Sequence, residues 1–286
     1  MSSLRTFSVG IFLFGIACAG PPSIPSAATS SDGTGIAFEI HGDDGPAVVL
    51  VHGWSNNRTF FDPHIPMLAG DHRVATMDLA GFGESGDSRS TWTMESFGQD
   101  VVAVVNALEL NEPVLVGFSM GGAAVLEAAS FLGEAVGGVV LVDVFQDVNQ
   151  RYDAELIPGI VEPIRETWHD FEMVRGYIGP AAPDSLVQRY IDKTPPVPPD
   201  YWWEAINEFF LWADADLIPT IQSISAPIAA INASETPTDV EAFRLYSPAF
   251  EATIIPEVGH IGVIWMKPDV FVESLRTFVR GMVGDE

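Results

Sequence analysis

The chain has 286 residues, and 47% of them are hydrophobic, which is enough to bury the core of one large domain or two small ones. Thirteen basic residues against 39 acidic ones leave a net charge of −26 at pH 7. Such a charge repels nucleic acids and anionic membrane surfaces, so general binders of either are excluded as the leading class.

The first nineteen residues have the pattern of a signal peptide. Arg5 supplies a basic start, residues 7–16 are nearly all apolar, and residues 17–19 are small enough for cleavage before Gly20. This apolar run is shorter than the roughly 20 residues that a membrane span needs, and no later run reaches that length without charges. We therefore expect an exported protein, in a bacterial periplasm or outside the cell, and no membrane span.

Cys18 is the only cysteine, and it lies inside this segment. Two fates are open for it: removal when cleavage follows Ala19, or lipidation as in a bacterial lipoprotein. Lipoprotein signals usually have Leu three residues before the cysteine, whereas this chain has Gly15. If cleavage follows Ala19, the mature chain contains no disulfide.

Residues 20–31 are rich in Pro, Ser and Ala and are expected to form a linker. Beyond them, apolar runs of strand length alternate with helical patterns. The runs occupy residues 47–51, 74–77, 114–117, 139–142, 228–231 and 253–255. Over 94–108 and 271–282, apolar residues recur every three or four positions, as one face of a helix requires. Unbroken apolar strands between helices predict a mainly parallel sheet that is covered on both faces.

Residues 147–215 interrupt this alternation. They contain no convincing strand but several prolines and many aromatic residues. An insertion of this size between two strands is most simply a helical cap, which divides the core into residues 32–146 and 216–286. Most cap aromatics are expected to pack within the cap or against the core, and a few to face a cavity. The candidates for the cavity are Trp168, Trp202, Trp203 and Trp212, together with Phe118 of the core.

The sharpest chemical signal is Gly-Phe-Ser-Met-Gly at residues 117–121, which follows a strand run and precedes the helix-forming residues 123–127. A strand-to-helix turn this tight needs small residues around its serine, and it holds the serine Oγ out at the edge of the sheet. Ser119 is therefore predicted to be a nucleophile.

A serine hydroxyl is a poor nucleophile near neutral pH, so it needs a base, an orienting acid and donors for an oxyanion. His260 follows the last strand run, where a loop can bring its imidazole over the sheet, and it is the predicted base. His52 stands at an earlier strand end and is expected to shape the loop of Trp54. The backbone N–H groups of Trp54 and Met120 are the predicted oxyanion donors, the second at a helix N-terminus.

Together these segments resemble the α/β-hydrolase superfamily, in its branch of cap-bearing esterases, lactonases and dehalogenase-like enzymes. The resemblance covers about residues 33–283. It rests on four motifs in order: His-Gly at 52–53, Asp-Leu-Ala-Gly-Phe-Gly-Glu-Ser at 78–85, the turn at 117–121, and Gly-His at 259–260. It implies a mainly parallel, doubly wound sheet with a helical cap inserted after the sixth strand. Dehalogenases and epoxide hydrolases of the family carry Asp as nucleophile, so Ser119 argues against both.

The acid of the predicted triad is open between two residues. The family's usual I-x-G-x-x-D loop is Ile-Asn-Ala-Ser-Glu-Thr at 231–236, so Thr236 replaces the usual Asp and Glu235 falls one residue early. Asp143 ends the strand after the nucleophile helix, a place from which some family members take their acid. We favour Asp143, because a loop without its usual Gly and Asp is released from that duty. Asp239 is a third candidate.

The expected function is hydrolysis of carboxylic esters or lactones through an acyl-Ser119 intermediate, which is resolved by water that His260 activates. The alternatives are a cofactor-free haloperoxidase, a C–C bond hydrolase of the same fold, and a ligand receptor with vestigial turnover. The sequence has no H-E-x-x-H, paired Cys or P-loop motif, so no metal or cofactor is expected. The expected partner is a small ester or lactone, and the oligomeric state is not predicted.

Overall fold

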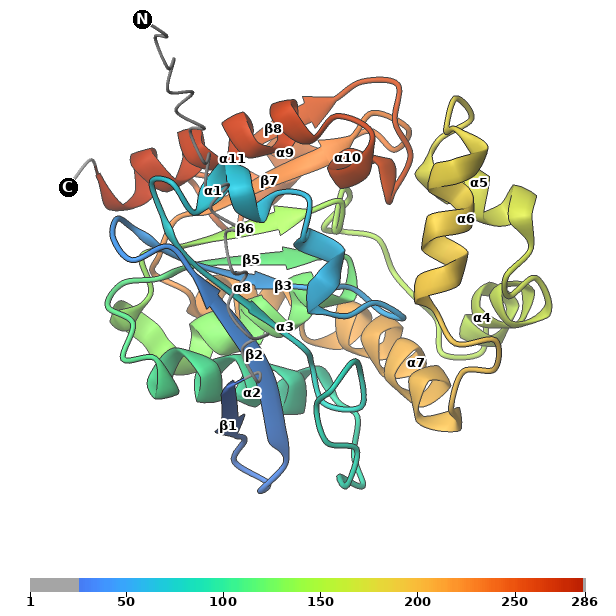
Figure 1. Ribbon diagram of the computed structural model, residues 1–286, viewed down its shortest axis with the longest axis horizontal. Coiled ribbons are helices and arrows are strands. Elements are labelled where there is room, and N and C mark those ends of the chain that lie inside the picture. Colours follow the sequence, from blue (N-terminus) through green and yellow to red (C-terminus); the bar gives the residue numbers. More distant parts are fainter. Residues whose placement is uncertain (1–25, 285–286) are drawn as a thin grey trace, which may run out of the picture.

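The computed structural model describes residues 26–284, which form one sheet with helices on both faces (Figure 1). The predicted signal peptide over 1–19, with Cys18, lies outside the described residues. Within 26–284, no helix combines the length and the apolar character that crossing a bilayer requires.

Eight strands form the sheet in the order β1-β2-β4-β3-β5-β6-β7-β8. Their bounds are β1 (Ser26–Thr29), β2 (Gly35–His41), β3 (Ala47–Val51), β4 (Arg73–Met77), β5 (Val114–Phe118), β6 (Gly138–Val142), β7 (Ile228–Ala233) and β8 (Glu251–Ile255). β2 runs antiparallel to both of its neighbours, and every other pair is parallel. The predicted mainly parallel sheet is therefore confirmed, and it covers all six runs that the sequence marks as strands.

The linker predicted over residues 20–31 is wrong at its end, because Ser26–Thr29 forms the edge strand β1. A short turn, in which Ser30 N–H donates to the Thr34 carbonyl (2.8 Å), leads from β1 into β2. The small residues of β1 carry little apolar pattern, and the strand is defined by its pairing with β2 alone. The sequence pattern therefore missed this hairpin.

Helices α2, α3 and α8 cover one face of the sheet, and α1, α10 and α11 cover the other (Figure 1). The helix bounds are η1 (Arg58–Phe61), α1 (Ile65–Leu68), α2 (Met94–Ala107), α3 (Met120–Leu132), η2 (Gly133–Ala135), α4 (Ile157–Glu166), α5 (Phe171–Ile178), α6 (Asp184–Lys193), α7 (Asp200–Ala215), α8 (Leu217–Ser223), α9 (Val240–Arg244), α10 (Gly262–Trp265) and α11 (Pro268–Val283). Each face of the sheet thus buries its own apolar layer, as a doubly wound fold requires.

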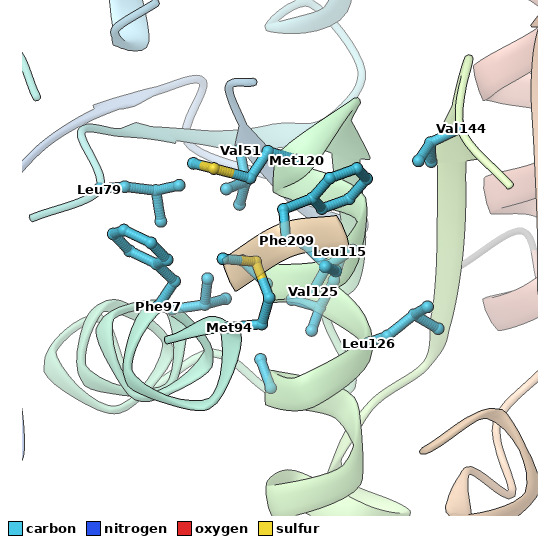
Figure 2. Packing of buried hydrophobic residues seen from close by; sticks show 14 of the residues in the cluster. Val51, Leu79, Met94, Phe97, Leu115, Met120, Val125, Leu126, Val144 and Phe209 are labelled. Atoms are coloured by element: carbon cyan, nitrogen blue, oxygen red, sulfur yellow. The ribbon is translucent and has the colours of Figure 1, made fainter. Parts of the chain in front are cut away.

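The layer between the sheet and α2–α3 fixes the position of α3. Figure 2 shows Met94 and Phe97 of α2 packed with Val125 of α3 and Leu115 of β5. All four side chains are buried, and burial of each stabilises the fold by about 1.5–3 kcal/mol. Because α3 is held in this way against β5, the turn between the two elements has a fixed geometry.

Helices α4–α7 lie between β6 and β7, within the segment predicted as a cap, and stand beyond the carboxyl ends of the parallel strands (Figure 1). Hydrogen bonds join α7 to the core: Trp54 Nε1 donates to the Trp202 carbonyl (2.6 Å), and Trp202 Nε1 donates to the Gly81 carbonyl (2.9 Å). In α6, Lys193 Nζ donates to the Thr59 carbonyl (3.0 Å). Ligands of open α/β sheets bind at this edge, so the cap covers the expected position of a site.

Candidate active site

Ser119 lies in the turn between β5 and α3, with φ 53° and ψ −124°. This left-handed φ is costly for a residue with a Cβ and persists only where the surroundings enforce it. The neighbouring glycines leave no room for side chains. A Cβ on Gly117 would overlap the backbone of Gly121, and a Cβ on Gly121 would lie 2.5 Å from the His52 carbonyl oxygen. The two glycines that flank Ser119 at positions 117 and 121 are therefore a steric requirement of this turn.

Ser119, His260 and Asp143 form a hydrogen-bonded chain. Ser119 Oγ lies 3.0 Å from His260 Nε2, and His260 Nδ1 lies 2.6 Å from Asp143 Oδ2. A carboxylate can only accept, so Nδ1 carries the hydrogen and donates it to Asp143, which leaves Nε2 to accept from the Ser119 hydroxyl. The imidazole also stacks on Phe118, with the ring centroids 4.8 Å apart. The arrangement can take the proton of the serine hydroxyl as it attacks.

The carboxylate of Asp143 is fixed by donors other than the imidazole. Its Oδ1 accepts from the backbone N–H of Ala233 (2.7 Å) and from Gln146 Nε2 (3.1 Å), and the residue is only 6% exposed. Its φ of 47° is also left-handed. The end of β7 therefore holds one carboxylate oxygen, so that the other points to His260.

The two other candidate acids lie elsewhere. Glu235 is exposed on the loop after β7, and within residues 26–284 no hydrogen bond or ion pair joins it to His260. Asp239 caps α9, where its side chain accepts from the backbone N–H of Ala242 (2.9 Å). Of the three carboxylates considered from the sequence, the structure brings only Asp143 to the imidazole.

The two predicted oxyanion donors lie on either side of Ser119. Within the described part of the chain, neither the Trp54 nor the Met120 backbone N–H has a hydrogen-bond partner. Met120 is the first residue of α3, where the helix dipole adds partial positive charge. Gly53 lets the Trp54 loop approach closely, because a Cβ there would lie 3.0 Å from the Ser119 Cβ. Both N–H groups are free to bind a negatively charged oxygen at this turn.

His52 shapes the Trp54 loop, as expected. Its Nε2 accepts from the Leu79 N–H (3.0 Å), so its Nδ1 carries the hydrogen and donates it to the Gly53 carbonyl (2.8 Å). Burial lowers the pKa of His52, although Asp78 opposes this shift, and the ring is neutral near pH 7. The residue fixes the loop and does not contact Ser119.

The motif at 78–85 also supports loops and supplies no reacting group. The buried carboxylate of Asp78 pairs with the Arg58 side chain and accepts from the backbone N–H groups of Arg58 (2.6 Å) and Glu84 (2.9 Å). Gly83 has φ 56°, and a Cβ there would overlap the Asp78 carboxylate. Through these contacts of Asp78 with Arg58, the motif fixes η1, the short helix that follows the Trp54 loop.

An apolar cavity of about 190 Å³ opens beside Ser119 and His260 under the cap. Its apolar wall includes Phe118, Trp168, Met173, Ile206, Phe209 and Phe210. Its polar side chains are largely paired with one another: Tyr190 Oη with Ser55 Oγ (3.2 Å) and His169 Nε2 with Thr194 Oγ1 (2.7 Å). Burial raises the pKa of Tyr190 and lowers that of His169, so both of these side chains are neutral near pH 7.

Three of the four cap tryptophans that were predicted to face the cavity do not line it. Trp202 donates to the Gly81 carbonyl, and Trp212 Nε1 donates to Glu127 Oε1 (2.6 Å), so both hold α7 against the core. Trp203 packs under the arginine side chain of α4, with the guanidinium 4.8 Å from the ring centroid. Of the residues predicted to line the cavity, only Trp168 of the cap and Phe118 of the core do so. The prediction is wrong for the other three because they form the seam between cap and core.

A second cavity, of about 350 Å³, opens on another side of the same pair, Ser119 and His260. It contains Gln146 and Glu235 together with aromatic side chains that the sequence analysis did not single out, such as Tyr177 and Phe209. No group of three or more His, Cys, Asp or Glu side chains between residues 26 and 284 is arranged to hold a metal ion.

Several known proteins are similar to this chain. A 3-oxoadipate enol-lactonase from Acinetobacter baylyi is 25% identical over 268 residues, which cover 89% of this chain and 96% of that protein. Other matches are shorter: the chain spans 39% of the length of one curated relative that it matches at 28% identity.

Two solved structures share the fold over nearly their whole length. An esterase from Exiguobacterium antarcticum superimposes with a TM-score of 0.76 at 22% identity, over 90% of this chain and 100% of that one. A bromoperoxidase from Bacillus anthracis superimposes with a TM-score of 0.74 at 21% identity, over 90% of this chain and 100% of that one. The model of the alpha/beta hydrolase family matches residues 48–274. The protein therefore belongs to the alpha/beta hydrolase family.

Proposed function

We propose that the protein is a serine hydrolase that cleaves carboxylic esters or lactones. The observation that carries this proposal is the chain of hydrogen bonds from Ser119 through His260 to Asp143, beside two unpaired backbone N–H groups. A nucleophile with a base, an acid that orients the base, and donors for an oxyanion are the parts that acyl transfer needs.

In the proposed reaction, Ser119 Oγ attacks the carbonyl carbon while His260 Nε2 takes its proton. The N–H groups of Trp54 and Met120 bind the oxygen that becomes negative, and Asp143 stabilises the imidazolium. His260 then returns the proton to the leaving alkoxide, and the acyl group stays on Ser119. A water molecule then attacks the acyl carbon while His260 takes its proton. The bond from the acyl group to Ser119 Oγ breaks, His260 returns the proton to this oxygen, and the acid leaves. A lactone opens by the same steps, with both products in one molecule.

The acyl part of the substrate is apolar in this proposal. The cavity beside Ser119 is lined mainly by aromatic and aliphatic side chains, and no Asp, Glu, Lys or Arg among residues 26–284 lines it. Such a surface favours medium-chain or aromatic acyl groups over small or charged ones. The haloperoxidase, C–C hydrolase and receptor alternatives use the same triad, and no contact in the structure favours one of them.

The test is hydrolysis of p-nitrophenyl esters from acetate to palmitate by the wild type, Ser119→Ala and Ser130→Ala. Ser130 is the matched control, because its Oγ only donates to the Glu127 carbonyl within α3. We expect a maximum at medium chain length and a loss of about 10⁴ to 10⁶ in kcat for Ser119→Ala alone. Full activity of Ser119→Ala, or a wild type that cleaves none of the series, would overturn the proposal.

A further inference from the structure

We propose that the second cavity beside Ser119 is the leaving-group subsite and that it selects esters of positively charged alcohols, with a quaternary ammonium group as the best fit. This inference rests on the proposed ester hydrolysis and names the substrate class on its alcohol side.

The position of the two cavities leads to the first half of the inference. Both are lined by Ser119, His260, Tyr177 and Phe209, so they meet at the nucleophile and its base. The acyl chain and the alcohol of an ester leave the reacting carbonyl carbon in different directions, so two cavities that meet there can receive one part each. The apolar cavity suits the acyl chain, and the alcohol then occupies the second cavity, beside the imidazole that must protonate it.

Aromatic rings form one wall of the second cavity. Phe145, Tyr152 and Phe209 line it, and the rings of Phe145 and Phe209 stack with centroids 5.8 Å apart. Phe145 has φ 55°, a costly conformation for a bulky residue, which the loop after β6 maintains. Burial raises the pKa of Tyr152, so its ring is a neutral phenol near pH 7. The faces of such rings attract cations, and quaternary ammonium groups above all.

The charged groups of the cavity favour the same ligand. Glu235 lines it from the loop after β7, and within residues 26–284 no ion pair involves this carboxylate. No Lys or Arg lines the cavity, and Asp143 is already paired with His260. An anionic leaving group therefore meets the carboxylate of Glu235 and no Lys or Arg side chain, whereas a cation meets that carboxylate and the aromatic wall. The apolar cavity is lined by no carboxylate and offers a cation no such partner.

The test compares three butyrate esters whose alcohols differ in charge: butyrylcholine, its uncharged isostere 3,3-dimethylbutyl butyrate, and anionic 2-sulfoethyl butyrate. Acid release is followed in a pH-stat at about 0.15 M salt, which limits long-range attraction by the whole protein. We expect kcat/KM for the choline ester to exceed that for its isostere about tenfold, and the sulfoethyl ester to be about tenfold poorer than the isostere.

Variants assign the preference to the cavity. Glu235→Gln is expected to lower the ratio of choline ester to isostere about threefold, and Tyr152→Leu to lower it further. The matched control is Glu251→Gln, because Glu251 is exposed at the start of β8, at the opposite end of the parallel strands from Ser119, and outside both cavities. Glu251→Gln removes one negative charge, as Glu235→Gln does, and should leave the ratio of kcat/KM for the choline ester to that for its isostere at the wild-type value.

Two outcomes would overturn the inference: an isostere cleaved as well as the choline ester, or equal effects of Glu235→Gln and Glu251→Gln. Hydrolysis of p-nitrophenyl butyrate in the same preparation separates the two proposals. If that ester is cleaved and no charge preference is found, only the inference fails. If no ester is cleaved, the proposed function fails with it.

Discussion

Replacing Asp143 by Asn changes one atom and should reverse the direction of the hydrogen bond to His260. The Ala233 N–H lies 2.7 Å from Asp143 Oδ1 and can only donate, so the amide of Asn must turn its oxygen toward Ala233. Its NH₂ then faces His260 Nδ1, which has to accept. The imidazole consequently carries its hydrogen on Nε2, where it points at Ser119 Oγ and cannot take the proton of the hydroxyl.

The opposite orientation of the amide is the less stable one. It would set the NH₂ of Asn against the Ala233 N–H in a buried site, which leaves donors unpaired at a cost of about 1–3 kcal/mol. The wrong tautomer of the imidazole therefore predominates. A triad with this defect loses about 10⁴ in kcat, which corresponds to about 5.5 kcal/mol of transition-state stabilisation.

The assay measures kcat on p-nitrophenyl butyrate for the wild type, Asp143→Asn and Glu235→Gln, scaled to the folded fraction from circular dichroism. Scaling is needed because Asp143 also holds the end of β7 through Ala233. Glu235→Gln should stay within about fivefold of the wild type, because within residues 26–284 no hydrogen bond or ion pair joins Glu235 to His260. The reasoning is refuted if Asp143→Asn stays within tenfold, or if Glu235→Gln shows the larger loss.

Three further predictions concern stability and processing. Burial lowers the pKa of His64, so the unfolded chain takes up a proton at this residue at a higher pH than the folded protein does. As the pH falls below about 6.5, this residue should lower the free energy of unfolding by up to about 1.4 kcal/mol per pH unit, and urea unfolding at pH 7.5 and 5.5 should show a shallower decline in His64→Gln. Gly121→Ala places a methyl group 2.5 Å from the His52 carbonyl and should lower the free energy of unfolding by about 1–3 kcal/mol, whereas Gly281→Ala, with open space around it, should raise it slightly; chemical denaturation compares the two. Expression in a bacterium should give a mature chain cleaved after Ala19, and a mass measurement that shows an intact or lipidated N-terminus would contradict this.

The turn that carries Ser119 could be predicted from sequence because small residues flank the serine between a strand run and a helix. Gly117 is required by contacts within this turn, where a Cβ would overlap the backbone of Gly121, whereas Gly121 is required by the approach of the Val51 and His52 carbonyl groups at the end of β3. Six strands could also be predicted, because each forms a continuous apolar run in the sequence. The hairpin of β1 and β2 could not be predicted, because Ser26–Thr29 acquires its strand conformation from pairing with β2.

The acid and the pocket depend on how distant segments meet. Asp143 and Glu235 both follow strands, and only the contact of Asp143 with the end of β7 decides which one reaches His260. In α7, one buried face serves both purposes: Ile206 and Phe209 line the cavity, whereas Trp202 and Trp212 donate to the core. Periodicity therefore cannot show which aromatic side chain faces a cavity and which one packs on the core, and the cap tryptophans were mostly misplaced for this reason.

Covalent labelling tests most directly whether Ser119 is an activated nucleophile. The wild type and Ser119→Ala are each treated with a fluorophosphonate, and the intact mass, the modified peptide and the residual esterase activity are measured together. We expect one phosphonyl group per chain, on the peptide that contains Ser119, with activity lost in proportion and no labelling of Ser119→Ala. Labelling of the variant to the same extent, or full inhibition of the wild type by modification of a different residue, would contradict it.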